Sequence, residues 1–223
     1  MMELEDAGMT AAHNATTIAV PFKTRLDALM GGGGRRMLGI VGPPGCGKST
    51  LAQALLEVVG SPAVVVPMDG HHLANVELAR LGRAARKGAE DTFDSAGYVA
   101  LLRRLKAQHA DEIVYAPQFR RDIDEPVANA IAVFPETSLV ITEGNYLLLN
   151  HGHWAAIRSL LDEIWYVEVD PVIRRARLVK RHMHFGRSLA AATDWVTVTD
   201  EPNAVRIEAS KSRADILFEW EKE

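Results

Sequence analysis

The stretch Gly42-Pro-Pro-Gly-Cys-Gly-Lys48-Ser49-Thr50 constrains the fold of this chain more than any other feature. It follows the pattern Gly-x-x-x-x-Gly-Lys-Ser/Thr, a loop whose backbone N–H groups wrap the phosphates of a nucleotide. In such a loop the lysine reaches the phosphates, and the hydroxyl that follows it reaches Mg²⁺. The residues predicted to hold the phosphates are Gly42, Pro43, Pro44, Gly45, Cys46, Gly47, Lys48, Ser49 and Thr50.

The residues on either side of the loop support this interpretation. The run Arg36-Met-Leu-Gly-Ile-Val41 predicts a buried strand, and residues 49–59 predict a helix with an apolar face. A strand, loop and helix in this order point free amides and the positive end of the helix at an anion. An ordinary glycine turn is the alternative, and it does not account for both flanking elements.

The composition favours one α/β domain rather than several. The chain has 223 residues, 48% of them hydrophobic, which is enough for one sizeable core. We expect a flexible tail at 1–17, a single P-loop domain over 18–223, and a lid around 183–200. With 25 basic and 29 acidic residues, the net charge of −4 gives no general footprint for nucleic acid.

Cysteine content and hydropathy bear on the compartment. The lone Cys46 excludes a disulfide within the chain and favours a reducing, cytoplasmic setting. Cys46 is either a redox-sensitive residue or simply a small residue at a variable position of the loop. The acidic start lacks the features of a signal peptide, and no apolar run of about 18 residues suits a membrane span.

Strand-like and helix-like segments alternate along the chain, which predicts a three-layer fold with a mostly parallel sheet covered on both faces. A short strand is expected at 112–115, and we expect Pro117 to end this strand. Further strands are expected at 63–69, 138–143, 164–169 and 214–218, and helices at 95–108, 154–161 and 170–182.

Three strand ends carry the candidate chemistry, because ligands of such sheets bind beyond the carboxyl ends of the strands. Lys48 is expected to bridge the β- and γ-phosphates, and Ser49 to bind Mg²⁺. Glu143 would orient the metal directly or through water; its alternative role is a salt bridge. Asp69 is a candidate base for a substrate hydroxyl, or else a cap of a helix or turn.

Several other polar residues lie near these strand ends. His71 and His72 follow Asp69, and without further ligands at zinc-like spacing we expect them to have acceptor-site or structural roles. The clusters Arg83-x-x-Arg86-Lys87 and Arg120-Arg121 either line an acceptor pocket or are surface charge.

An acid-free stretch from Arg174 to Arg187 contains six Lys or Arg residues. Helical spacing places Arg174, Arg177 and Arg181 on one face. The stretch is either a mobile lid that closes over the γ-phosphate or a solvated helix face.

Together these residues resemble the uridine kinase, phosphoribulokinase and bacterial pantothenate kinase family. The similarity is greatest to the branch named nucleoside/nucleotide kinase-like or fructose transport system kinase. The matching pieces cover nearly all of residues 36–218 in order. They are Gly42–Thr50, Val66-Pro-Met-Asp-Gly-His-His72, Arg86-Lys-Gly-Ala-Glu-Asp-Thr-Phe-Asp94, Tyr115-Ala-Pro-Gln-Phe119, Glu143-Gly-Asn-Tyr-Leu-Leu148, and Asp200-Glu-Pro-Asn-Ala204 with Ala214-Asp215.

The resemblance implies ATP-dependent transfer to an alcohol. It makes Asp69 the acid that activates the acceptor, Glu143 an acid of the metal or acceptor site, and Arg181 or Arg187 a lid residue. It also places Asn145 and Tyr146 near the acceptor and suggests a homodimer. His71 and Arg120 depart from the residues common in relatives, Phe and Asp.

We therefore expect a small-molecule kinase that uses Mg-ATP. Its acceptor would be a sugar, a nucleoside or a pantothenate-like molecule, with neither nucleic acid nor membrane as partner. The alternative is a switch-type NTPase that regulates a partner. The absence of an Asn-Lys-x-Asp motif and of a Leu-Ser-Gly-Gly signature argues against switch and motor classes.

Overall fold

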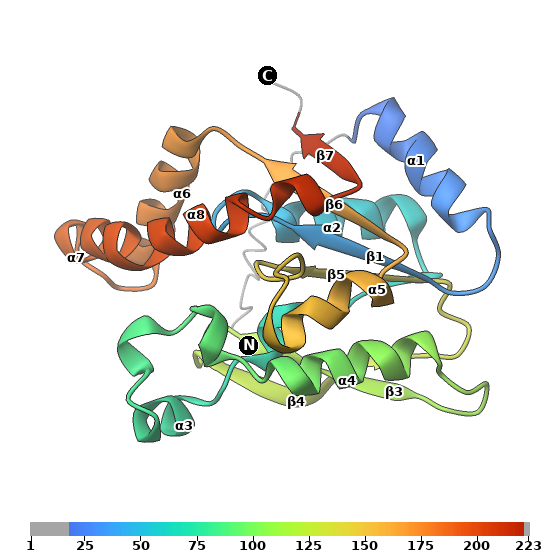
Figure 1. Ribbon diagram of the computed structural model, residues 1–223, viewed down its shortest axis with the longest axis horizontal. Coiled ribbons are helices and arrows are strands. Elements are labelled where there is room, and N and C mark those ends of the chain that lie inside the picture. The colour runs from blue at the N-terminus through green and yellow to red at the C-terminus, as the bar shows by residue number, and fades with distance from the viewer. Residues whose placement is uncertain (1–17, 221–223) are drawn as a thin grey trace, which may run out of the picture.

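The apolar run before the phosphate loop forms β1, which lies at the centre of a five-stranded parallel sheet (Figure 1). The computed structural model describes residues 18–220, so the predicted tail at 1–17 lies outside the described residues. All residues of the neighbouring strand β5 are buried, as expected for a strand covered on both faces. From edge to edge the strands are β2 (Ala63–Val65), β5 (Leu139–Gly144), β1 (Arg36–Val41), β6 (Glu163–Glu168) and β7 (Ile216–Glu219).

Helices cover both faces of the sheet and enclose two apolar cores (Figure 1). One core joins α1 (Val20–Met30) and α2 (Lys48–Val59) to Trp165 and Phe218 of the sheet. The other core joins α4 (Ser95–Lys106) and the segment 152–160 to the opposite face. The α/β prediction with a sheet between two helical layers is therefore confirmed. The segment 152–160 consists of a 3₁₀ turn, Gly152–Ala156, and α5, Ile157–Leu160.

A separate antiparallel ribbon, β3 (Val114–Arg120) and β4 (Glu125–Val133), packs below the main sheet (Figure 1). The expectation that the first of these strands ends at Pro117 is wrong, because the strand continues through it. The pairing shifts at this point, from Ala116 opposite Ile131 to Gln118 opposite Val127. Proline has no N–H to donate to a partner strand, so a bulge can accommodate it within a paired strand.

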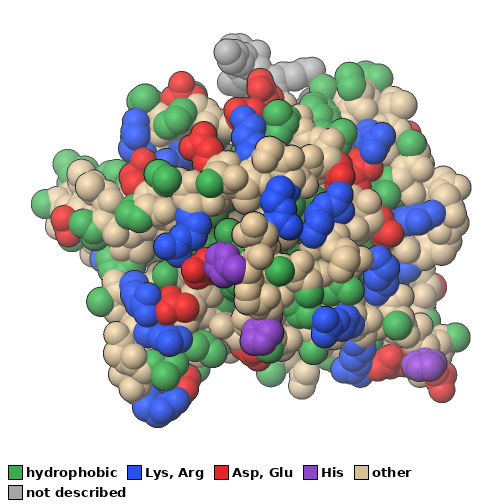
Figure 2. Space-filling view, viewed as in Figure 1, with side chains coloured by type: hydrophobic (Ala, Val, Ile, Leu, Met, Phe, Trp, Pro, Cys, Tyr) green, Lys and Arg blue, Asp and Glu red, His purple; other side chains and the backbone are tan. Residues whose placement is uncertain are grey.

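The basic stretch begins a helical arm that extends to one side of the sheet (Figure 1). Asp170 caps its first helix by accepting from the Val172 N–H at 2.7 Å, and Pro171 opens the helix as predicted. Figure 2 shows apolar side chains at the outer end of the arm, where Phe185 and Leu189 are exposed. The arm contains α6 (Pro171–His184), α7 (Leu189–Trp195), a π-helical turn (Val196–Asp200) and α8 (Glu201–Glu208).

The remaining described elements are short. They are α3 (Asn75–Arg80) and 3₁₀ turns at Met68–His71, Ala84–Arg86, Glu90–Thr92 and Lys211–Arg213. Among the described residues, no helix combines the length and apolar character needed to cross a membrane.

Gly70 sets how closely the ribbon approaches the turn that follows β2. A Cβ at this position would overlap the carbonyl oxygen of Pro117 and crowd its ring. The contact lies between two backbones, so no side-chain rotation relieves it. Gly70 therefore fixes the distance between β3 and the turn Met68–His71.

We predict that Gly70→Ala lowers the free energy of unfolding by about 1–3 kcal/mol, because the ribbon must move away from the turn. Urea denaturation measures this change. Gly32→Ala is the matched control, since the nearest atoms there belong to the flexible end of Arg36. Equal stability of the two variants would contradict the close-packing argument.

Candidate functional site

The register of the parallel sheet brings the predicted acids next to the phosphate loop. Ile40 of β1 lies opposite Glu143 of β5, and the phosphate loop starts directly after β1. The Ser49 hydroxyl donates to Glu143 Oε1 at 2.8 Å. Asp69 follows the neighbouring strand β2, so the three predicted strand ends do meet at one edge.

The phosphate loop is packed tightly and shaped by its glycines. Gly45 and Gly47 adopt φ values of 80° and 97°, in the left-handed region that favours glycine. A Cβ on Gly45 would lie 2.8 Å from Leu178 Cγ of α6. The Lys48 side chain is 8% exposed, and its ammonium donates to the carbonyls of Gly42 and Pro43 at 3.0 and 3.2 Å. The lysine therefore already curves across the loop.

Cys46 is fully buried beneath the loop. Burial raises the pKa of its thiol, although the nearby Lys48 ammonium opposes the rise. A buried thiol that stays protonated is a poor nucleophile. This favours the interpretation of Cys46 as a small packing residue over a redox-sensitive one.

Glu143 is a buried carboxylate with opposing neighbours. It is 6% exposed, and burial raises its pKa, with the Asp69 carboxylate adding to the rise. The Lys48 ammonium and the Ser49 hydroxyl act in the opposite direction. The Ser49 hydroxyl and the Glu143 carboxylate are hard oxygen donors, which is the type of ligand that Mg²⁺ prefers.

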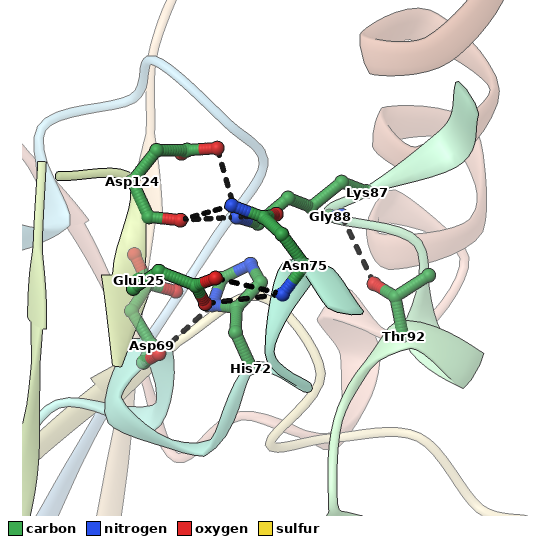
Figure 3. A network of polar contacts seen from close by, with 8 residues as sticks. All are labelled: Asp69, His72, Asn75, Lys87, Gly88, Thr92, Asp124 and Glu125. Atoms are coloured by element: carbon green, nitrogen blue, oxygen red, sulfur yellow. Dashed lines mark hydrogen bonds and ion pairs between the residues drawn. The ribbon is translucent and has the colours of Figure 1, made fainter. Parts of the chain in front are cut away.

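Asp69 lies in the 3₁₀ turn after β2 and faces the ribbon. Its Oδ2 is 3.4 Å from Nη2 of Arg121, a half-exposed residue just after β3. Its backbone carbonyl accepts from His72 Nδ1 at 2.8 Å (Figure 3). Asp69 is thus held by its own turn while its carboxylate stays partly open to solvent.

The two histidines after Asp69 have different surroundings. The His72 ring lies 4.0 Å from Phe93 and 4.7 Å from Phe119 between centroids. Burial lowers the pKa of His72, so the ring is neutral at pH 7. Because the Asp69 carbonyl oxygen can only accept a hydrogen bond, the proton of the neutral ring is assigned to Nδ1. His71 instead packs against Tyr98 of α4 at 5.2 Å, and its Nε2 is buried without a hydrogen-bond partner among the described residues.

Lys87 belongs to a polar network that ties α3 to the tip of the ribbon (Figure 3). Its ammonium, on a side chain that is 13% exposed, donates to Asn75 Oδ1 at 2.7 Å and to Asp124 Oδ2 at 2.9 Å. The Asn75 N–H in turn donates to Glu125 at 2.9 Å. These bonds favour a structural role for Lys87 over a role in binding a ligand. Arg86 pairs with Asp91 in the same segment.

Tyr146 and Asn145 follow β5 directly. Tyr146 is buried against Trp154 and Phe93, and its hydroxyl donates to the Gly88 carbonyl at 2.5 Å. It thereby supports the segment that carries Lys87. Asn145 is only half-buried, so it is the more accessible of the two.

The arginines of the arm divide into buried, exposed and site-facing groups. Arg174 is buried and pairs with Glu201, whereas Arg177 is exposed. Burial and the nearby Arg121 lower the pKa of Arg181, while Asp200, Asp69 and Glu143 raise it. Arg181 is therefore within electrostatic reach of both candidate acids. Arg187 lies over the Trp195 ring, with its guanidinium 3.9 Å from the ring centroid.

A groove of about 380 Å³ opens beside Ser49 and Glu143. Its walls come from α2, β2 and the ribbon, and they include Gln53, Leu56, Val65, Pro67, Gln118 and Ile131. The sequence offered Arg120 and Arg121 as an acceptor-pocket lining, but it did not predict the antiparallel ribbon that positions them or the packing of Phe119 against His72. Burial alternates along the first part of β3, but its sequence gives no such signal because the strand begins with four apolar residues in a row, Val114 to Pro117.

The fold and the loop define a P-loop nucleotide-binding protein, and comparisons with known proteins narrow the class. The chain belongs to the Phosphoribulokinase / Uridine kinase family, whose model matches residues 37–222. It is accordingly an ATP-dependent kinase of that family.

Individual relatives agree with this assignment. The ATP-dependent kinase-like protein notR' of Aspergillus versicolor is 42% identical over 61% of this chain and 84% of its own length. A Schizosaccharomyces pombe protein, named provisionally a uridine kinase, is 40% identical over 68% of each chain. A Silicibacter sp. TM1040 structure, assigned provisionally as a fructose transport system kinase, has a TM-score of 0.76 at 38% identity. That match covers 86% of this chain and 98% of the other.

We predict that Lys87→Ala loosens the tip of the ribbon, because it removes the cation shared by Asn75 and Asp124. The expected loss of stability is about 1 kcal/mol, with faster amide hydrogen exchange at 120–125. Arg120→Ala is the control, since Arg120 forms an exposed pair with Asp122 at the same tip. Unchanged exchange in the Lys87 variant would contradict a structural role.

Proposed function

We propose that this kinase transfers the γ-phosphate of ATP to a hydroxyl of a small-molecule acceptor. The observation that supports it best is the meeting of Ser49, Glu143 and Asp69 at one sheet edge beside Lys48. Phosphoryl transfer depends mainly on positioning and on stabilising charge. This group of residues supplies both requirements.

Magnesium fits the donor set at the loop. In the proposal the Ser49 hydroxyl and the Glu143 carboxylate hold it, the latter directly or through water. The bound ion would neutralise charge on the β- and γ-phosphates. Lys48 would leave the carbonyls of Gly42 and Pro43 to bind the same phosphates.

Asp69 is the proposed base for the acceptor hydroxyl. Its carboxylate is accessible, and the carbonyl bond to His72 fixes the turn that carries it. Arg121 lies beside it from the ribbon. Arg181 is the proposed lid residue that stabilises charge on the transferring phosphoryl group, in preference to Arg187, whose guanidinium stacks on Trp195.

The acceptor is proposed to lie between the turn at Asp69 and the ribbon. Neutral His72, Arg121 and Asn145 would contact it, while Tyr146 and Lys87 hold the surrounding segments in place. The names of two relatives refer to uridine and to fructose transport, and both compounds carry several hydroxyls. A sugar or nucleoside is therefore the first class to test, with a pantothenate-like alcohol next.

The test is a panel of sugars, sugar phosphates, nucleosides and pantothenate, each incubated with Mg-ATP. ADP release is followed by a coupled assay, and the phosphorylated product by mass spectrometry. An acceptor-dependent rate with a mass gain of one phosphoryl group supports the proposal. Fast hydrolysis that no acceptor changes would support the switch-type NTPase instead.

We predict that Asp69→Asn lowers kcat by about 10²–10⁴-fold, because the amide cannot accept the acceptor proton. The affinity for ATP should stay close to that of the wild type, since the proposed partner of Asp69 is the acceptor hydroxyl and the phosphates bind the loop. Steady-state kinetics and calorimetric titration measure the two effects. Wild-type turnover in this variant would remove Asp69 from the role of base.

We predict that Mg-ADP binding weakens as the pH falls, because protonation of Glu143 removes a metal ligand. Burial and Asp69 raise the pKa of Glu143, so the loss begins above the ordinary value of about 4.3. Asp69→Asn removes one negative neighbour and should move this loss to lower pH. Calorimetric titration of the wild type and of Asp69→Asn measures the affinity for Mg-ADP at each pH, and the comparison cancels the protonation of ADP itself. An identical pH dependence in the two proteins would contradict the coupling between Asp69 and Glu143.

A further inference from the structure

Trp220 lies against the phosphate loop, although it is far from the loop in the sequence. It follows β7 directly, and a Cβ on Gly47 would lie 3.1 Å from its indole Nε1. Its ring packs edge-on against Phe218 at 4.9 Å between centroids, and Phe218 itself is 1% exposed. Trp220 is only half-buried, so part of the indole remains open beside the loop.

The order of the strands separates the two flanks of the loop. Asp69 follows β2 and Glu143 is the second-last residue of β5, so both acids lie on one side of β1. Trp220 follows β7, at the opposite edge of the same parallel sheet. The two flanks therefore present different chemistry: carboxylates on one side and an aromatic ring on the other.

A nucleotide has a direction that matches this arrangement. Its transferable phosphate is at one end and its base at the other, with the remaining phosphates between them. When the loop holds the phosphates and the terminal one points at Asp69, the nucleoside end leaves the loop towards β6 and β7. Trp220 lies on that side, next to the loop at Gly47.

We propose that Trp220 is part of the nucleotide-binding site and that its indole contacts the base of bound ATP or ADP. The inference rests on the proposed function only for the direction in which the terminal phosphate points. Aromatic rings stack on bases favourably, and the face of an indole is broad and apolar. The contact with Phe218 fixes the ring before the nucleotide arrives, which lowers the entropic cost of binding.

The test compares ADP with inorganic tripolyphosphate, which has the phosphates but no base, by calorimetric titration without acceptor. Trp220→Ala should weaken ADP binding by about 10-fold and leave the affinity for tripolyphosphate unchanged. Trp220→Phe keeps a ring and should restore most of the ADP affinity. In the wild type, ADP should also change the intrinsic tryptophan fluorescence, and this change should be smaller in the Phe variant.

Two outcomes would overturn the inference. Unchanged ADP affinity in Trp220→Ala would show that the indole does not touch the nucleotide. Equal weakening of ADP and tripolyphosphate would show that Trp220 only supports the loop at Gly47. Neither outcome depends on phosphoryl transfer, so a failure of the kinase proposal in the acceptor screen would be recognised separately.

Discussion

The site depends on the contact between the start of α2 and the end of β5. Ser49 and Glu143 come from elements far apart in the chain, and the parallel register of β1 and β5 brings them to 2.8 Å. A shift of this register by one residue would turn Glu143 to the other face of the sheet. Because all residues of β5 are buried, such a shift would also bury polar groups without partners. Core packing thereby protects the geometry of the candidate metal ligands.

The ribbon has a similar relation to the acceptor side. Gly70 lets β3 approach the turn that carries Asp69, and this approach places Arg121 beside the carboxylate. The network around Lys87 then fixes the far end of the ribbon to α3. Two supports therefore hold the candidate base Asp69 in position: the backbone contact at Gly70 and the charged hydrogen bonds of Lys87. Both supports act on position and neither needs to touch a ligand.

Much of this arrangement follows from the sequence, because parallel strands bring their carboxyl ends to one edge. That rule was enough to group the phosphate loop with Asp69 and Glu143. The ribbon was predicted only in part, since Pro117 was expected to end a strand that in fact continues through it, and the pairing with β4 shifts at a bulge. The partners of Lys87 and Tyr146 were not predictable either. Asp124 lies 37 positions from Lys87 and Gly88 lies 58 positions from Tyr146, and only the packing of loops decides which of these polar groups meet.

The distribution of paired and accessible groups bears on acceptor recognition. Of the basic residues near the ribbon, Lys87 and Arg86 are already paired with acids, whereas Arg121 makes only a long contact with Asp69. Opposite it, His72 is neutral because burial lowers its pKa. An acceptor in this space would therefore meet the Arg121 guanidinium, the Asp69 carboxylate and a neutral imidazole packed against two aromatic rings. Such a set suits hydrogen bonding to several hydroxyls, because the guanidinium can donate and the carboxylate can accept, whereas the nearby charges of Asp69 and Glu143 disfavour a multiply charged anion.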